Sequence, residues 1–335
     1  MYEAHFGLRR RPFPATPDLD SYYPATGHEE ALAQLLQALG DCESFAVLTG
    51  EPGTGKTLLG QRLVQELSQN TIAAFLTHSH VSDPRALLQA LAHDFGLLHE
   101  GKSEQELRLA LTDFLLDNYS EGRRNLIIMD EAQNLQPVLL EELRLLSNLE
   151  GPSGRALQVV LVGQAPLRES LRGAEMRALQ QRVGAAARLL PLEIHEAADY
   201  LAHHLRFAGR QPEAVVTDEA MEMLARKSCG IPRLLNRLGH AALRLAWQAD
   251  LPQVDAEVAL ECVALCGWAA EDSSDSMATP TADSSGAISS ESLAEHSPTP
   301  GAVLALEPTE VPGSPPGRRA GSRTRRLAPG PKRPA

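Results

Sequence analysis

Apolar residues in the first two thirds of the chain form short continuous runs separated by longer amphipathic stretches. From residue 45 onward, five such runs predict strands, at 45–49, 71–77, 126–129, 157–162 and 185–190. Apolar spacings of three and four residues predict helices between them, near 56–68, 84–95, 104–118 and 137–149, with two short helical stretches before the last strand. Strands that read as continuous apolar runs are typical of parallel sheets buried on both faces. The pattern therefore predicts an α/β fold with a parallel sheet.

After Pro191 the strand pattern stops and only helical spacing remains. Four segments carry it, near 195–208, 218–227, 232–249 and 255–266. Thr217 is a suitable N-cap for the second of these, and Gly230 stands where a helix C-terminus is expected. These features predict a small all-α domain.

Residues from Glu271 onward are mostly Ser, Thr, Pro, Gly and Ala, and large apolar residues are scarce. Such a segment buries too little surface to offset its chain entropy, so it is predicted to be disordered.

The first 27 residues differ from the rest in composition. Five of the 14 aromatic residues of the chain lie within the first 23 positions, interleaved with prolines. We expect an extended segment that packs on the sheet domain. The predicted organisation is this segment at 1–27, the sheet domain at 28–192, the helical domain at 193–268 and a disordered C-terminal region at 269–335.

Charge excludes one class of function for the chain as a whole. Lys and Arg total 31 against 43 Asp and Glu, a formal net charge of −12, which argues against a basic nucleic-acid-binding protein. The charge is unevenly spread, because 271–310 holds eight acids and no Lys or Arg, whereas 311–335 holds seven bases and no acid. The basic tail could contact anionic lipid headgroups or nucleic acid, although a merely solvated tail is the simpler interpretation.

The apolar runs are strand-sized, far shorter than the roughly 20 residues that span a bilayer. The N-terminus also lacks the charged and apolar regions of a secretory signal. We therefore expect a cytoplasmic location.

A phosphate-binding motif follows the first predicted strand. GEPGTGKT at 50–57 fits GxxxxGK[ST] and lies between a strand and a helix, the context that the motif requires. Its glycines allow successive backbone N–H groups to face phosphate oxygens at a helix N-terminus. Lys56 would reach the β- and γ-phosphates, and the Thr57 hydroxyl would ligate Mg²⁺. The predicted ligands are thus ATP and Mg²⁺, bound by Gly50, Glu51, Pro52, Gly53, Thr54, Gly55, Lys56, Thr57 and Leu58.

Two acidic residues end the third predicted strand. Four apolar residues at 126–129 deliver Asp130 and Glu131 to the carboxyl edge of the sheet, where α/β proteins bind ligands. Asp130 would hold the Mg²⁺ shell, and Glu131 would polarise the attacking water as the general base. The two motifs together predict ATP hydrolysis.

Further segments carry a family resemblance, namely MYEAHFGL at 1–8, RPF at 11–13, TPD at 16–18, GHEEAL at 27–32, VLTGE at 47–51, DEAQNL at 130–135, LRLLSNLE at 143–150 and LVGQ at 161–164. With the phosphate loop, they resemble the AAA+ ATPases, in particular the ExeA/GspA-like branch that includes the MshM pilus-biogenesis ATPases. The resemblance covers about residues 1–268 and implies a P-loop NTPase sheet, or AAA+ core, with an all-α lid.

The resemblance also implies sensor residues. Gln164 occupies the place of a polar sensor after a core strand, where many AAA+ proteins have Asn or Thr; Asn148 is a second candidate, although helix capping explains it more simply. Arg233, in GIPR at 230–233, resembles the sensor-2 arginine that reaches from the lid to the γ-phosphate. An ordinary arginine of a basic helix is the alternative.

An arginine finger is implied as well, inserted into the site of a neighbouring subunit. Arg182, in QRVG at 181–184, is our choice, with Arg177 and Arg188 as rivals. A solvated surface arginine is the alternative.

Three aromatic residues of the N-terminal segment, Phe13, Tyr22 and Tyr23, would then help to form the adenine pocket. Simple packing on the sheet domain explains them equally well.

The resemblance implies an oligomeric, Mg²⁺-dependent ATPase that supports assembly of a secretion or type IV pilus-like system. Its partners would be further copies of itself and components of that system, in the cytoplasm or peripherally at the inner membrane. One alternative is a TniB-like ATPase regulating DNA transposition, which the acidic body disfavours and the basic tail favours. The other is a slow nucleotide-dependent switch acting through partner docking.

Overall fold

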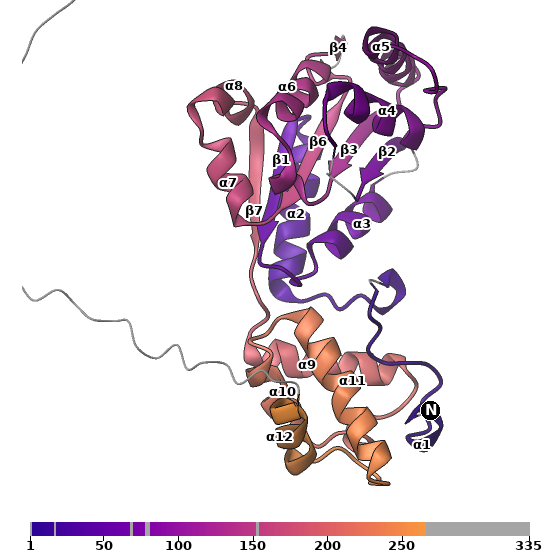
Figure 1. Cartoon of the computed structure of the whole chain (residues 1–335), viewed down its shortest axis with the longest axis vertical. Coiled ribbons are helices and arrows are strands. Elements are labelled where there is room, and N and C mark those ends of the chain that lie inside the picture. Colours follow the sequence, from indigo (N-terminus) through magenta and orange to yellow (C-terminus); the bar gives the residue numbers. More distant parts are fainter. Residues whose placement is uncertain (1, 17, 68–69, 78–80, 152–153, 266–335) are drawn as a thin grey trace, which may run out of the picture. The chain divides into compact units, whose positions relative to one another are not determined.

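The centre of the molecule is a parallel sheet. The computed structural model describes residues 2–16, 18–67, 70–77, 81–151 and 154–265. Five strands are ordered β2-β3-β6-β1-β7 and all run parallel (Figure 1). Their bounds are β1 Phe45–Gly50, β2 Thr71–Leu76, β3 Arg124–Met129, β6 Gln158–Gly163 and β7 Val183–Leu189. The predicted α/β class is confirmed, and each strand overlaps its predicted range.

The strand register aligns the carboxyl ends of the inner strands. Thr49 of β1 lies beside Gly163 of β6 and Arg188 of β7. Met129 of β3 lies beside Leu161 of β6. The segments that leave β1, β3 and β6 therefore emerge at one edge of the sheet.

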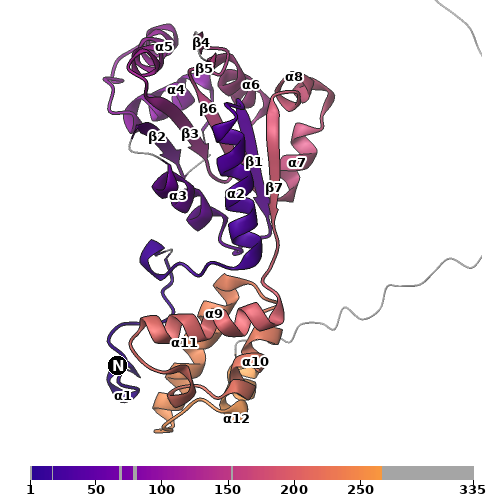
Figure 2. The same cartoon turned by 180° about the vertical axis from the view of Figure 1, so that it is seen from behind.

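Helices cover both faces of the sheet. Alternate strand residues point to opposite faces. One set packs with α2 (Thr26–Gly40) and α3 (Lys56–Glu66), which lie over the face turned to the viewer in Figure 2. The other set packs with helices that follow β2, β3 and β6: α4 Pro84–Asp94, α5 Glu104–Ser120, α6 Pro137–Leu146, α7 Ala165–Leu171 and α8 Arg177–Gln180.

No helix was predicted from the sequence over the residues of α2, although apolar residues recur there at helical spacing. Leu32, Leu35 and Leu39 recur at helical spacing and are buried against the sheet. A short hairpin of β4 (Glu150–Gly151) and β5 (Gly154–Arg155) was not predicted either. Four-residue and shorter elements carry too little periodicity for such a prediction.

The last four helices form a second core. They are α9 Ile194–Phe207, α10 Asp218–Lys227, α11 Pro232–Gln248 and α12 Ala256–Leu265, close to the four predicted ranges. The Thr217 hydroxyl accepts the N–H of Ala220, as predicted for an N-cap. Gly230 has a φ of +70°, and a Cβ there would lie 1.9 Å from the carbonyl oxygen of Leu192. Only glycine fits where the segment after β7 crosses the segment before α11.

The N-terminal segment packs mainly on these helices and not, as we expected, on the sheet domain. Tyr2, Phe6 and Phe13 are buried in the helical core. A Cβ at Gly239 of α11 would lie 2.7 Å from the Phe13 ring, so this glycine makes room for it. Later in the segment, Tyr22 packs against the sheet side, and the 3₁₀ helix Leu19–Ser21 contacts α3. The expectation is wrong for residues 2–13, because aromatic composition predicts burial without indicating which core provides it.

The structure tests neither the predicted domain boundaries nor the predicted C-terminal disorder. The division at 28–192 and 193–268 stays a prediction. The predicted disorder of 269–335, including the basic tail, concerns residues outside those described. Among the helices of the described residues, none is both long and apolar enough to span a membrane.

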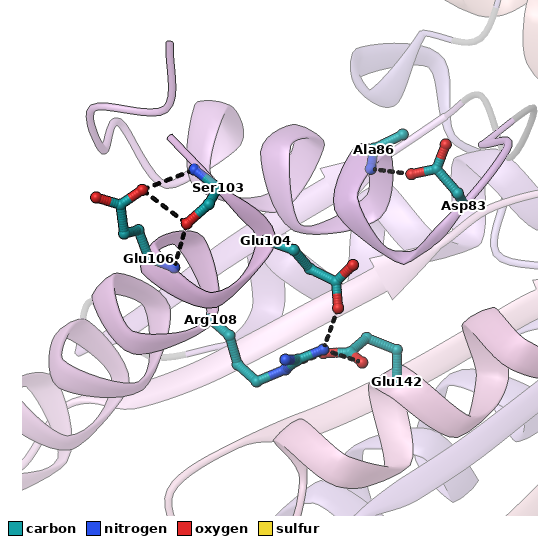
Figure 3. A network of polar contacts seen from close by, with 7 residues as sticks. All are labelled: Asp83, Ala86, Ser103, Glu104, Glu106, Arg108 and Glu142. Carbon is teal, nitrogen blue, oxygen red and sulfur yellow. Dashed lines mark hydrogen bonds and ion pairs between the residues drawn. The ribbon is translucent and has the colours of Figure 1, made fainter. Parts of the chain in front are cut away.

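A polar network joins two helices of the sheet region. Figure 3 shows Arg108 of α5 between Glu104 on its own helix and Glu142 on α6. The Nε and Nη2 atoms of Arg108 donate to the two carboxylate oxygens of Glu142 at 2.9 and 2.8 Å. The Glu142 side chain is only 5% exposed, so this bidentate pair supplies the cation that its carboxylate needs.

We expect Arg108→Ala to lower the free energy of unfolding by about 2 kcal/mol, because it leaves a carboxylate buried without its cation. The loss is smaller than for a fully buried pair, because the Arg108 side chain is 37% exposed. Urea unfolding followed by circular dichroism measures the change. Arg226→Ala, which breaks the exposed pair with Glu222, is the control and should cost no more than about 0.5 kcal/mol. Equal losses in the two variants would contradict the assignment.

Candidate nucleotide-binding site

The predicted phosphate loop joins β1 to α3 in a conformation that requires glycine. Gly53 and Gly55 have φ values of +85° and +97°. A Cβ at Gly50 would lie 2.5 Å from the carbonyl oxygen of Leu189. The loop therefore curls tightly ahead of the N-terminus of α3, where backbone N–H groups favour an anion.

The two predicted magnesium ligands meet at this edge of the sheet. The Thr57 hydroxyl donates to Oδ2 of Asp130 at 2.6 Å, although 73 residues separate them. Asp130 is 3% exposed and follows β3 directly. A hydroxyl and a carboxylate are hard oxygen donors, the kind that Mg²⁺ prefers, so the residues fit this ion.

Lys56 extends along the loop. Its ammonium group donates to the carbonyl of Glu51 at 2.7 Å, and the residue is 6% exposed. Burial lowers the pKa of Lys56, while the nearby carboxylates of Glu131 and Asp130 act in the opposite direction. The cation is thus desolvated and held next to the phosphate position.

Glu131 is fixed by an unusual backbone and by two amides. Its φ of +53° is rare for a non-glycine residue. Its Oε2 accepts from Nε2 of Gln133 at 2.6 Å and from Nε2 of Gln164 at 3.2 Å. The Gln133 hydrogen bond is the largest cause that holds the pKa of Glu131 below its usual range, against the effect of burial. The predicted base and the predicted sensor are therefore in direct contact.

Arg233 reaches the same place from the helical region. Its backbone N–H, one of the unpaired donors of the first turn of α11, donates to the carbonyl of Gly53 at 3.2 Å. The positive charge of Arg233 also lowers the pKa of Lys56 and of Glu131, although other causes contribute more to both shifts. The predicted sensor-2 residue thus adjoins the phosphate loop.

A pocket of about 420 Å³ lies beside these groups. Its lining includes Gly53, Gly55, Lys56, Thr57 and Leu58 of the loop, with Glu131, Gln164 and Arg233. The predicted aromatic residues Phe13, Tyr22 and Tyr23 also line it, together with the unpredicted Tyr200 and Asn236 of α9 and α11. Nothing in the sequence distinguishes those two from other residues of amphipathic helices.

His28 lines the pocket, although the sequence indicates no role for it. It lies in the GHEEAL segment, is buried, and its Nε2 is 2.9 Å from the carbonyl oxygen of Thr54. Because a carbonyl only accepts, the ring nitrogen is the donor here. Burial lowers the pKa of His28, so the neutral ring supports the phosphate loop.

Arg182 does not join this site. It precedes β7, and its carbonyl accepts the N–H of Phe45 at the beginning of β1, so it lies at the opposite edge of the sheet from the phosphate loop. Its rivals Arg177 and Arg188 are exposed, on α8 and β7. Within one copy of the chain, none of these arginines lines the pocket described above.

Comparison with known proteins agrees with this geometry. A family model described as an AAA domain matches residues 41–171. General secretion pathway protein A of Aeromonas hydrophila is 40% identical over 249 residues, which are 74% of this chain and 45% of that protein. The chain therefore contains an AAA domain and resembles general secretion pathway protein A over about three quarters of its own length.

Other similarities are shorter or structural. The ATP-dependent target DNA activator B of Escherichia phage Mu is 36% identical over 104 residues, 31% of each chain. The ORC2 protein of Aeropyrum pernix, solved as ADPNP–ADP complexes, matches the fold with a TM-score of 0.57 at 17% identity, covering 76% of this chain and 71% of that one. The ORC2 similarity shows the fold alone, whereas the AAA domain match, which includes the phosphate loop, supports an ATPase-type nucleotide-binding protein. The chain spans less than half of the length of its secretion relative.

We expect Gly53→Ala to weaken ADP binding about tenfold, because a left-handed backbone costs an L-residue about 1–2 kcal/mol. The added Cβ would also lie 2.9 Å from Cβ of Arg233. Isothermal titration with ADP measures the change. Gly40→Ala is the matched control, since nothing lies within 4 Å of its Cβ position, and it should bind ADP as the wild type does. Unchanged affinity in Gly53→Ala would show that the loop tolerates another conformation.

Proposed function

We propose that this protein binds Mg²⁺ and ATP and hydrolyses the terminal phosphate. The observation that carries the proposal is the 2.6 Å contact between Thr57 and Asp130, with Lys56 and Glu131 lining the adjoining pocket. A loop that only binds nucleotide needs no carboxylate to act as a base. The position of Asp130 and Glu131 beside the phosphate loop therefore supports ATP hydrolysis over nucleotide binding alone.

The proposed roles follow from chemistry and position. Thr57 and Asp130 would hold Mg²⁺, which supplies charge neutralisation for the phosphate oxygens. Lys56 and Arg233 place two further cations at the phosphate end of the pocket. Glu131, whose pKa is lowered, is ionised at neutral pH and can accept a proton from a positioned water. Gln164 would sense the terminal phosphate while in contact with that base.

We expect Glu131→Gln to lower kcat by at least a hundredfold and to leave ATP affinity within about threefold, because the amide keeps the shape of the side chain but accepts no proton. Phosphate release and nucleotide titration measure the two quantities. Turnover at the wild-type rate would identify a different base. Wild-type protein without any ATPase activity would overturn the proposed function itself.

We further propose that copies of the chain associate, with Arg182 completing a neighbouring site. Its neighbours Arg144 and Arg155 each pair with a carboxylate, of Glu141 and Glu150. Arg182 instead donates only weakly, to the Ser147 hydroxyl at 3.4 Å, and has no ion pair within the described residues. Burial, then the charges of Arg155 and Arg144, lower its pKa. A poorly compensated guanidinium is suited to an incoming phosphate.

Mixing two inactive proteins tests the association. Arg182→Ala and Lys56→Ala should each lose most ATPase activity, and a mixture should recover part of it, because some interfaces then combine an intact phosphate loop with an intact finger. Activity against mixing ratio measures this, with mixed oligomers verified by tagged pull-down. Verified mixed oligomers without recovery would contradict a finger acting between copies.

The process served by hydrolysis is proposed from the secretion relative. Similarity to general secretion pathway protein A supports a role in assembly of a secretion or type IV pilus-like system, in the cytoplasm or peripherally at the inner membrane. The similarity to a target DNA activator favours a second candidate, regulation of DNA transposition. The two differ in one property: only the second requires duplex DNA binding, which the basic residues at 311–335 would supply.

A further inference from the structure

The Gln133 side chain makes two hydrogen bonds that none of the predicted roles uses. It lies on the 3₁₀ helix Ala132–Asn134, directly after the acidic pair. Its side chain donates to Glu131, as described, and its Oε1 accepts the backbone N–H of Gln164 at 3.0 Å. A backbone N–H can only donate, so it must face the amide oxygen, and the Gln133 NH₂ group is thereby turned toward the carboxylate.

The space for this side chain is provided by the end of β6. A Cβ at Gly163 would lie 2.7 Å from Oε1 of Gln133 and 3.0 Å from the Leu167 side chain. Because Gly163 has no Cβ, the Gln133 amide can reach the backbone N–H of Gln164. Base, Gln133 and sensor then form a closed hydrogen-bonded ring, because Gln164 also donates to Glu131.

Gln133 stands behind the pocket. Glu131 and Gln164 line the cavity, whereas Gln133 is not among the lining residues. Any effect on a bound nucleotide must therefore pass through these two neighbours. The left-handed backbone of Glu131 makes such support necessary, since a strained residue keeps its direction only where its surroundings fix it.

We propose that Gln133 is a positioning residue that ties the carboxylate of Glu131 to Gln164, so that base and sensor act as one unit. The proposal rests on the proposed ATP hydrolysis. A charge-assisted hydrogen bond orients the Glu131 carboxylate. Gln133 therefore affects the chemical step and leaves nucleotide binding to the residues of the pocket.

Gln133→Met removes the amide while keeping a side chain of similar length. We expect kcat to fall at least fivefold and ADP affinity to stay within twofold of the wild type. Gln133→Glu keeps the acceptor for Gln164 but sets a second carboxylate against Glu131, so its kcat should fall at least as far while ADP affinity again stays within twofold.

Asn134→Ala is the matched control, since Asn134 is an exposed neighbour on the same 3₁₀ helix, and it should leave kcat and ADP affinity unchanged. Thermal melting of every variant detects a loss of folding. Should Gln133→Met not fold, the kcat and ADP affinity of Gln133→Glu decide. An unchanged or increased kcat in a folded variant would overturn the proposal.

A double-mutant comparison separates positioning from a general structural effect. If Gln133 acts through the base, adding Gln133→Met to Glu131→Gln should cost less than twofold beyond the single change. A further fivefold loss in the double variant would contradict the proposal. An active wild type with an inactive Glu131→Gln and a normal Gln133→Met would remove this inference alone, whereas a wild type without ATPase activity would remove the proposed function.

Discussion

The parallel register of β1, β3 and β6 is the constraint on which the candidate site depends. It brings Thr57, Asp130 and Gln164 to one edge although long segments separate them in sequence. Because side chains alternate between faces along a strand, a shift of β3 by one residue would reverse the face on which each of its residues lies. The buried apolar residues on both faces of β3 oppose such a shift, so the core that stabilises the sheet also sets the geometry of the site.

Two hydrogen bonds join the sheet region, including the phosphate loop, to the helical region. The N–H of Arg233 contacts Gly53, and the N–H of Thr26 at the start of α2 contacts the Glu196 carboxylate on α9 at 2.9 Å. The N-terminal segment contributes aromatic side chains to the helical core and also lines the pocket. Displacement of α11 would therefore break a contact at the phosphate loop itself. Such a link provides a physical route from bound nucleotide to helix position.

Polar groups at the centre of the site are fixed by neighbours rather than by intrinsic preference. Glu131 adopts a backbone conformation that few residues of its type adopt, and two amides hold its carboxylate. Lys56 is desolvated next to two acids. Both arrangements cost free energy locally, and the surrounding sheet, turn and helix ends offset that cost. This is the distribution of strain expected where preorganised charge serves a bound ligand.

The sequence by itself determined the parts whose information is local. A phosphate loop needs its glycines, lysine and threonine in one continuous segment, and the acidic pair follows directly from a buried apolar strand, so both could be identified and placed at the sheet edge. The alternation of strand and helix likewise predicted the sheet and the later helices. Tertiary structure alone decided that the N-terminal aromatic residues join the helical core, that His28 supports Thr54, and that Gln133 links Glu131 to Gln164. Each of these depends on which distant segments pack together, and packing is a property of the assembled cores that no local pattern encodes.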